Sequence, residues 1–381
     1  NIKNQESFTL ERREDYWAKN SPFKRYKFNF DKIKVSVVKD NDALQFEKFK
    51  KGEQDIFTVN RSRRWIEETD FDAASKGWVK KQRVFSEKPA GTSGYYFNMR
   101  EWPFNDKRIR YAFCYLYNRE KMNKEMYYNE YDMMNSLYSG SVYENKDNNS
   151  FPHNPEEAIK LLKEVGYIDR NSDGWLVHNE TGKVLSFEIA IQKTSAYMVT
   201  PVQQMLKEYG LDMQIKFMDY NTIIKNVNAR NFNICMLGYS GLVYPNPESS
   251  LRSTLADQND NNNVWGFKST RVDDLLDEYD ICFDQKRRIE IIREIDGIFG
   301  DVHPIAYSIA RNYSRAMWWD KFGYPEWMFS RYVGEHWDVF DYWWYDEEKD
   351  VQLKDAIKSD KKLPLKPIDM KYWPIYLSEN S

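Results

Sequence analysis

The chain has 381 residues, a length that allows two or three domains with substantial cores. Its 56 basic and 59 acidic residues give a net charge of -3, so the charge balance offers no basic field for nucleic acid or anionic lipid. We therefore disfavour nucleic-acid binding. No run approaches the roughly 20 apolar residues of a membrane span, and residues 1–10 contain no apolar segment of a secretory signal.

Aromatic residues and cysteines give two further expectations. The aromatic content is 16%, with 13 Trp and 27 Tyr, which predicts aromatic packing in cores and interfaces or, alternatively, a cleft lined by rings. Cys114, Cys235 and Cys282 lie far apart in apolar runs, so we expect them to be small buried side chains. Such a sparse, odd set neither requires nor excludes an oxidising compartment.

In chain order, the hydrophobic pattern first predicts strands and helices separated by short turns. Gly52 is expected to end the first helix, because glycine accepts the left-handed conformation that follows many helices. The predicted elements up to residue 100 are a strand at 33–38, a helix at 42–50, a strand at 55–57 and a two-faced strand at 95–99.

A capped helix is predicted directly after Pro103. Asn105 is the expected N-cap, and Asp106 places negative charge in the first helical turn. An apolar stripe follows at helical spacing and is expected to be the buried face: Ile109, Ala112, Phe113 and Leu116.

The middle of the chain alternates between helix and strand patterns. Asn154 as N-cap, Pro155 at the first helical position and two glutamates predict a helix that ends before Gly166. The later predicted elements are a strand at 185–191, a helix at 195–209, strands at 213–218 and 233–237 with a helix between them, and helices at 270–283 and 284–300. This alternation predicts an α/β fold with helices packed on a sheet.

Several segments carry a resemblance that extends over nearly the whole chain. They are Gly52–Phe57, Trp65, Tyr96–Asn98, Pro103–Arg110, Asn123–Tyr128, Asn154–Ala158 with Leu161 and Leu162, Trp319–Gly323, and Trp343–Asp346. These segments resemble the family 5 extracellular solute-binding proteins, and most of all the Yej-type branch of ABC importer receptors.

The resemblance implies a two-lobed α/β fold of the type II periplasmic-binding-protein kind, with mixed sheets flanked by helices. It implies that residues 1–88 belong to the first lobe, that 89–304 form the second, and that 305–381 return to the first lobe and end in a tail. Members of the family normally begin with a signal peptide and a long N-terminal region, whereas this chain begins in the middle of the family pattern. We expect it to correspond to the C-terminal two-thirds or so of such a receptor.

The best candidates for ligand contact follow the last strand of the sheet pattern. Open α/β sheets place ligands beyond the carboxyl ends of their strands, which is the position of Tyr239, Ser240 and Gly241. The resemblance implies a loop that often carries a Trp and then an Asp that pairs with a peptide amine. Leu242 and Val243 occupy the region of that Asp here, so we expect a blocked, modified or differently oriented ligand. The alternative is a packing turn.

Five further residues are weaker candidates for ligand contact. Trp265 stands beside a glycine and is expected to flank a cleft or to seal a core edge, and Asn98 and Arg100 follow the aromatic strand. Arg63 and Trp65 belong to a cationic and aromatic cluster that is suited to a ligand carboxylate or, alternatively, forms a solvated face.

The segment 169–180 matches the spacing of a calcium loop. Oxygen-bearing side chains stand at the first, third, fifth and twelfth loop positions, and a glycine stands at the sixth, as such a loop requires. The expected ligands of a structural Ca²⁺ are Asp169, Asn171, Asp173, Glu180 and the carbonyl of Trp175. A strand rather than a helix is predicted to follow, so the alternative is an Asx-rich turn without metal.

Catalysis has little support in the residues. The four histidines form no zinc-binding helix pattern, residues 238–242 lack the final glycine of a nucleophile elbow, and no phosphate-binding glycine loop is present. We therefore expect no enzyme activity and no required cofactor.

The resemblance implies a periplasmic or otherwise extracytoplasmic protein that captures oligopeptides or peptide-like solutes for a membrane ABC permease by hinge closure. We expect it to be a monomer. One alternative, motivated by the abundance of Trp and Tyr, is a carbohydrate-binding or carbohydrate-cleaving extracellular protein. Another is an interaction module with no small ligand.

Overall fold

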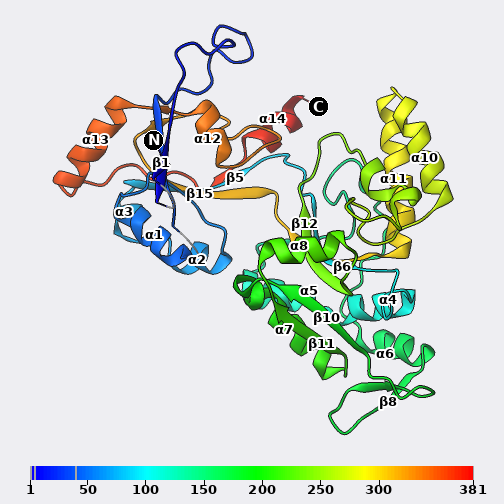
Figure 1. The fold of residues 1–381 in the computed structure, drawn as a ribbon. Coiled ribbons are helices and arrows are strands. Elements are labelled where there is room, and N and C mark those ends of the chain that lie inside the picture. The colour runs from blue at the N-terminus through cyan, green and yellow to red at the C-terminus, as the bar shows by residue number, and fades with distance from the viewer. Residues whose placement is uncertain (1, 4–5, 39–40, 381) are drawn as a thin grey trace. The chain divides into compact units, whose positions relative to one another are not determined.

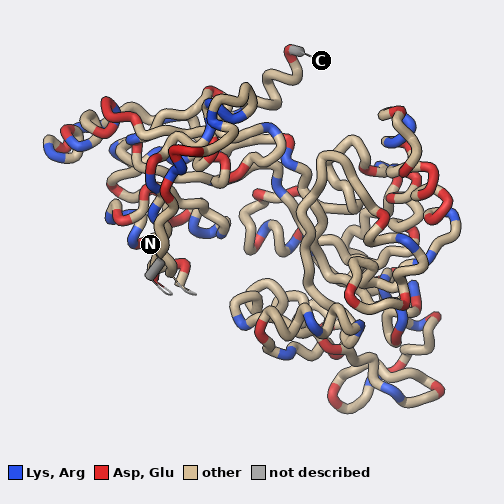
Figure 2. The backbone as a smooth tube through the Cα atoms, turned by 45° about the horizontal axis from the view of Figure 1, so that its top comes forward, with Lys and Arg blue, Asp and Glu red and all other residues tan. Residues whose placement is uncertain are grey.

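The computed structural model describes residues 2–3, 6–38 and 41–380, and the chain forms two compact units. One unit comprises Asn1–Lys88 and Asn312–Ser381, and the other comprises Pro89–Arg311 (Figure 1). Basic and acidic residues are interspersed along both units (Figure 2). None of the helices in the described residues is long and apolar enough to cross a membrane.

The second unit, residues 89–311, is built on a mixed sheet with the strand order β11-β10-β12-β6-β13. Its strands are β6 (Thr92–Phe97), β10 (Ser186–Ile191), β11 (Asp212–Phe217), β12 (Ile234–Tyr239) and β13 (Ile305–Tyr307). Strands β10, β11 and β12 are parallel, whereas β6 is antiparallel to both β12 and β13. Thr92 at the start of β6 therefore pairs with Tyr239 at the carboxyl end of β12.

Helices cover both faces of this sheet, because successive side chains of a strand point to opposite faces. Tyr95 and Phe97 enter one core, while Tyr96 between them enters the other. The first core contains α4 (Lys107–Leu116), α6 (Pro155–Glu164) and α7 (Ala196–Glu208). The second contains α8 (Tyr220–Asn228), α10 (Thr270–Ile281) and α11 (Gln285–Val302), of which α10 and α11 lie side by side in Figure 1.

The second unit also contains shorter elements. They are α5 (Arg119–Tyr127), β7 (Asp132–Met133), β8 (Tyr167–Arg170), β9 (Leu176–His178), η1 (Lys193–Ser195), α9 (Glu248–Leu251), η2 (Ser253–Leu255) and β14 (Ile309–Ala310). Strands β8 and β9 pair as an antiparallel hairpin, and β14 pairs with β7.

The helix predicted after Pro103 is α4, but its N-cap is Asp106 and not Asn105. The Asp106 carboxylate accepts a hydrogen bond of 2.8 Å from the backbone N–H of Arg108. Asparagine and aspartate cap helices with similar chemistry, which is why the pattern alone did not separate two adjacent candidates. The predicted stripe of Ile109, Ala112, Phe113 and Leu116 is buried.

Other predicted elements lie where the pattern places them. The Asn154 side chain accepts a hydrogen bond from the N–H of Glu157 at the start of α6, which confirms that cap. Cys114 and Cys235 are buried as predicted, whereas Cys282 is only half-buried at the end of α10.

The first unit has its own sheets and helices. Its strands are β1 (Ile2–Lys3), β2 (Ser7–Glu11), β3 (Lys32–Ser36), β4 (Ile56–Thr58), β5 (Val79–Phe85), β15 (Tyr313–Trp319), β16 (Phe322–Gly323), β17 (Trp344–Tyr345) and β18 (Asp369–Met370). Its helices are α1 (Asp42–Lys50), α2 (Ser62–Glu67), α3 (Asp72–Ser75), α12 (Trp337–Tyr342), α13 (Glu347–Lys358) and α14 (Tyr372–Asn380). The main sheet has the order β18-β5-β15-β4. Met317 on β15 packs with α1, α2 and α3, while its neighbours Ala316 and Trp318 enter the opposite core.

Candidate ligand-binding pocket

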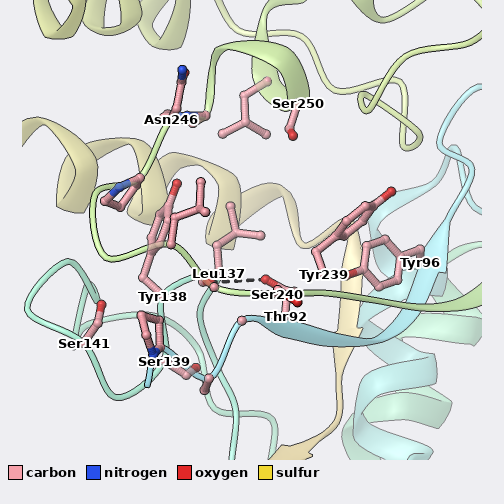
Figure 3. A pocket seen from close by; sticks show the side chains of 18 of the residues that line it. Thr92, Tyr96, Leu137, Tyr138, Ser139, Ser141, Tyr239, Ser240, Asn246 and Ser250 are labelled. Atoms are coloured by element: carbon pink, nitrogen blue, oxygen red, sulfur yellow. Dashed lines mark hydrogen bonds between the residues drawn. The ribbon is translucent and has the colours of Figure 1, made fainter. Parts of the chain in front are cut away.

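A cavity of about 140 Å³ lies at the carboxyl end of β12, on the face of the sheet that packs against α10 and α11. Three segments of the second unit line it: residues 89–96, residues 137–141 and residues 239–251, to which Trp265 adds its ring. Figure 3 shows these segments around the cavity. The position agrees with the rule that open α/β sheets bind ligands beyond the carboxyl ends of their strands.

Two glycines let the first and third segments approach closely. Gly91 has a positive φ of 72°, and a Cβ atom placed there would collide with the carbonyl oxygen of Tyr239. A Cβ atom at Gly241 would lie only 2.5 Å from the Cβ of Pro89. The wall of the cavity that contains Tyr239 and Ser240 therefore depends on backbone contact that only glycine permits.

The buried carboxylate of Asp296 on α11 forms hydrogen bonds at the second segment of the cavity lining, residues 137–141. Asp296 accepts hydrogen bonds from the Ser136 hydroxyl at 2.6 Å, from the backbone N–H of Leu137 at 3.1 Å and from that of Asn145 at 2.9 Å. The Asn148 side-chain amide donates a fourth at 3.0 Å. Burial raises the pKa of Asp296 to about 6, although these donors act in the opposite direction.

Single hydrogen bonds connect the other walls to the fold. The Tyr279 hydroxyl on α10 donates to the Pro245 carbonyl at 2.6 Å, and the Thr92 hydroxyl donates to the Leu137 carbonyl at 3.2 Å. The second bond joins the start of β6 to the loop that Asp296 holds, and it is visible in Figure 3.

Three aromatic rings form the floor of the cavity. Tyr96 and Trp265 stack with centroids 5.6 Å apart and an interplanar angle of 13°, and Tyr239 meets Tyr96 edge-on at 5.9 Å. Tyr96 is 0% exposed and Trp265 is 2% exposed, whereas Tyr239 is 41% exposed. Figure 3 shows Tyr239 beside Tyr96. Burial raises the pKa of both Tyr96 and Tyr239, so these phenols remain neutral hydrogen-bonding groups at physiological pH.

The described residues that line the cavity include no formally charged side chain. Its polar groups are the hydroxyls of serine, threonine and tyrosine side chains, the amide of Asn246, the indole of Trp265 and backbone groups. Leucine and proline residues are among the remaining lining residues. Such a cavity suits an uncharged group with apolar parts and a few hydrogen-bonding atoms.

The structure brings four predicted site residues together at this cavity: Tyr239, Ser240, Gly241 and Trp265. Trp265 is also buried in the core that contains α10 and α11, so it packs at a core edge, which was the alternative prediction for this residue. The loop itself begins later than predicted, since β12 continues to Tyr239.

Asn98 and Arg100 lie away from the cavity and have structural partners. The buried Asn98 amide donates to the carbonyls of Arg230 and Phe232, and its oxygen accepts from Arg100. The Arg100 guanidinium donates to the carbonyls of Ala256, Asn263 and Val264. These bonds connect the end of β6 to the Asn-rich loop 256–264, so we leave both residues out of the proposed binding surface.

Arg63 and Trp65 belong to the first unit and do not form one ligand-facing cluster. Trp65 is buried in the core that contains α1 and α3, and Arg63 on the exposed face of α2 pairs with Glu67 at 2.8 Å. Alternate positions of a short helix point in different directions, so neighbours in sequence serve a core and a solvated face.

The predicted calcium loop is a tight turn in the β8–β9 hairpin. The Asn171 side-chain oxygen accepts from the N–H of Asp173 at 3.1 Å and from that of Trp175 at 2.9 Å, and the Trp175 carbonyl accepts from the N–H of Asn171. Two predicted ligand atoms are thus occupied by the turn itself. Asp169 and Glu180 are exposed, and no group of three or more His, Cys, Asp or Glu in the described part of the chain is placed to hold a metal. The calcium prediction is therefore not supported.

Sequence reasoning missed most of the cavity wall. The missed lining residues include Gly91, Thr92, Tyr96, Leu137, Tyr138, Ser139, Pro245, Asn246 and Ser250. The sequence did contain a sign of these walls. Residues 89–99, 133–143 and 231–247 include no charged residue, although 30% of the chain is charged. Each of these three runs contributes a wall of the cavity.

A model of the bacterial extracellular solute-binding proteins of family 5, middle part, matches residues 1–262. The chain is 25% identical over 388 residues to the uncharacterised protein YejA of Escherichia coli, a match that covers 93% of this chain and 63% of the relative. The chain thus spans less than two-thirds of that relative's length. The resemblance to the Yej-type branch, inferred above from motifs, is confirmed by this similarity.

Solved structures of the same fold are similar along most of the chain. The oligopeptide-binding protein AppA of Bacillus subtilis, solved with a nonapeptide, gives a TM-score of 0.73 at 19% identity and covers 91% of this chain and 65% of its own. A periplasmic oligopeptide-binding protein of Thermotoga maritima, solved with mannohexaose, gives a TM-score of 0.67 at 19% identity over 84% of this chain and 61% of its own. These likenesses confirm the predicted fold class, a type II periplasmic-binding-protein fold with mixed sheets flanked by helices.

Proposed function

The chain belongs to the family 5 bacterial extracellular solute-binding proteins, and from this premise we propose that it captures a peptide or peptide-like solute outside the cytoplasm for an ABC permease. Its role in this proposal is selective binding without catalysis. The AppA structure with its nonapeptide supports a peptide as the first candidate ligand.

The observation that carries the proposal is the uncharged aromatic cavity beside Tyr239, Ser240 and Gly241. A free amine or carboxylate buried there would lose hydration without meeting an opposite charge, at a cost of several kcal/mol. The ligand group that enters the cavity is therefore neutral, such as a blocked end, a modified end or an uncharged side chain. Leu242, where relatives of this kind are expected to carry an amine-binding Asp, agrees with that conclusion.

We further propose that the two units are the two lobes of the receptor. The chain passes between them at residues 88–89 and again at 311–312, which gives the paired connections that a hinge needs. Ligand binding would favour the closed arrangement only to the extent that the ligand contacts that arrangement better than the open one.

Native mass spectrometry of the full-length protein purified from its own host, followed by identification of any released molecule, tests the proposal. Calorimetry then compares one peptide series in two forms, with free ends and with N-acetyl and C-amide ends. We expect the blocked form to bind at least tenfold more tightly. We also expect Y239A to weaken binding and F283A, which changes an exposed aromatic side chain away from the cavity, to leave it unchanged. Failure of both peptide forms to bind would reject a peptide ligand.

An uncharged oligosaccharide is a second candidate, because stacked aromatic rings and hydroxyl groups also suit sugar rings. The Tyr96–Trp265 stack and the hydroxyl-bearing walls favour it, as does the mannohexaose bound to the Thermotoga maritima protein. Calorimetry with mannohexaose under the same conditions distinguishes the two ligand classes.

A further inference from the structure

Two buried polar atoms on residues that line the cavity have no hydrogen-bond partner among the described residues. They are the Tyr96 hydroxyl and the Trp265 indole N–H, and both are buried with no acceptor among the described residues. Both residues line the cavity, and their rings stack on one another. An indole nitrogen can only donate a hydrogen bond, so at least one donor beside the cavity is left unsatisfied by the described residues.

Buried donors without partners are rare in folded proteins because they lose hydration and gain nothing in exchange. Here the two atoms belong to one stacked pair of rings that lines a cavity, where a ligand is available to supply the missing acceptor. A negatively charged acceptor would meet no cation in this uncharged cavity. A neutral oxygen atom is the acceptor that the surroundings favour.

Tyr239 lies beside the ring that carries one of these polar atoms. Its ring packs edge-on against Tyr96 and is 41% exposed.

We propose that Tyr96 and Trp265 determine ligand specificity by donating hydrogen bonds to the carbonyl oxygen of an uncharged acyl or amide group of the ligand. This inference rests on the proposed function, since it names the part of a peptide-like solute that occupies the cavity. The Tyr96 ring and the Trp265 ring contact the apolar atoms of the same group, and Tyr239 closes over it.

The Y96F variant tests the inference, with Y307F as its matched control. The Tyr307 hydroxyl is also buried without a described partner, in the same core, but Tyr307 does not line this cavity. Each change removes one unsatisfied hydroxyl, so we expect both variants to melt at the wild-type temperature or above it. We expect only Y96F to lose affinity, by tenfold or more, for an N-acetylated and C-amidated peptide in calorimetry.

Nuclear magnetic resonance supplies a second readout. The indole N–H signal of Trp265, identified as the one missing from the W265F spectrum, is expected to move downfield when the blocked peptide binds to the wild-type protein. In Y307F the same shift is expected.

The outcomes separate this inference from the function on which it rests. A wild-type protein that binds neither blocked nor free peptides overturns both. Peptide binding with equal affinity in wild type, Y96F and Y307F overturns the inference and leaves the peptide function standing. A lower melting temperature of Y96F with unchanged affinity also overturns it, because that result assigns the hydroxyl to a partner within the folded protein, such as a buried water.

Discussion

The sequence predicts site residues in two loops of the second unit. In the structure, the polar groups at these two loops differ in whether they have hydrogen-bond partners. In the β8–β9 hairpin, the Asn171 oxygen accepts from the N–H groups of Asp173 and Trp175, so the turn satisfies itself. At the end of β12, Tyr239 packs edge-on against Tyr96, and the Tyr96 hydroxyl and the Trp265 indole N–H have no partner among the residues that the structure describes.

The difference shows why a polar motif is a weak sign of a ligand. Asx side chains are common in turns because they bond to the backbone that follows them, and this bonding consumes the oxygens a metal would need. In the binding site that we propose the reverse holds, because the groups that would meet the ligand have no partner among the described residues. That property appears only when distant segments of the chain are brought together.

The largest expected effect is a loss of stability when a methyl group is added at Gly91, which packs against the backbone of residues 239–241. The same change at Gly174, in the β8–β9 turn, is the comparison. Gly91 and Gly174 both have positive φ, 72° and 85°, so alanine at either position carries a similar backbone strain of about 1–2 kcal/mol. At Gly91 the new Cβ also collides with the Tyr239 carbonyl, whereas at Gly174 nothing lies within 4 Å. We expect G91A to destabilise the protein by about 2–5 kcal/mol and G174A by only the strain. Urea denaturation of both variants measures the difference.

G91A and G174A should also differ in their affinity for the ligand. The collision in G91A displaces residues 239–241, so we expect its affinity for a blocked peptide to fall more than tenfold, while G174A binds as the wild type does. Equal stability losses in the two variants would contradict the backbone contact between residues 89–91 and 239–241.

The second prediction concerns the carboxylate that holds one wall of the cavity. Burial raises the pKa of Asp296 from 3.8 to about 6, so the folded state binds a proton more strongly than the unfolded state between these pH values. The stability that Asp296 contributes is therefore full below about pH 4 and is lost as the pH rises through about 6. We expect the stability of wild type relative to D296N to fall by up to about 3 kcal/mol between pH 4 and pH 7.

Denaturation of wild type and D296N across this pH range measures the effect. S136A is the matched control, because it removes one donor and keeps the carboxylate, and it should retain the pH dependence. A wild-type advantage over D296N that stays constant with pH would show that Asp296 does not titrate differently in the folded protein.

Much of the second unit's fold was predictable because its signals are local. The cap at Asn154 and the buried stripe on α4 depend on residues within a few positions of one another. The capping error at Asn105 has the same origin, since Asp106 beside it offers equivalent chemistry and tertiary context selects between them.

The candidate site was predictable at Tyr239, Ser240 and Gly241, where a topological rule and a family resemblance coincide, and at Trp265, an aromatic residue beside a glycine. The remaining walls could not be placed, because the pairing of Thr92 with Tyr239 and the hydrogen bond that the Leu137 N–H donates to Asp296 join residues more than a hundred positions apart. Local pattern carries no information about such contacts.

The smallest expected effect is that of a substitution in the β8–β9 hairpin. It tests whether the loop between these strands is a turn without a bound metal. N171A removes the acceptor of two backbone hydrogen bonds on a half-exposed loop, so we expect a loss of about 1 kcal/mol and wild-type affinity for the ligand. Because these bonds, and not a metal, hold the loop, excess Ca²⁺ or EDTA should leave the melting temperature of wild type unchanged in differential scanning calorimetry. A rise in melting temperature with Ca²⁺ that N171A abolishes would instead mean that the Asn171 oxygen exchanges its backbone partners for a metal, and the contrast between the two loops would disappear.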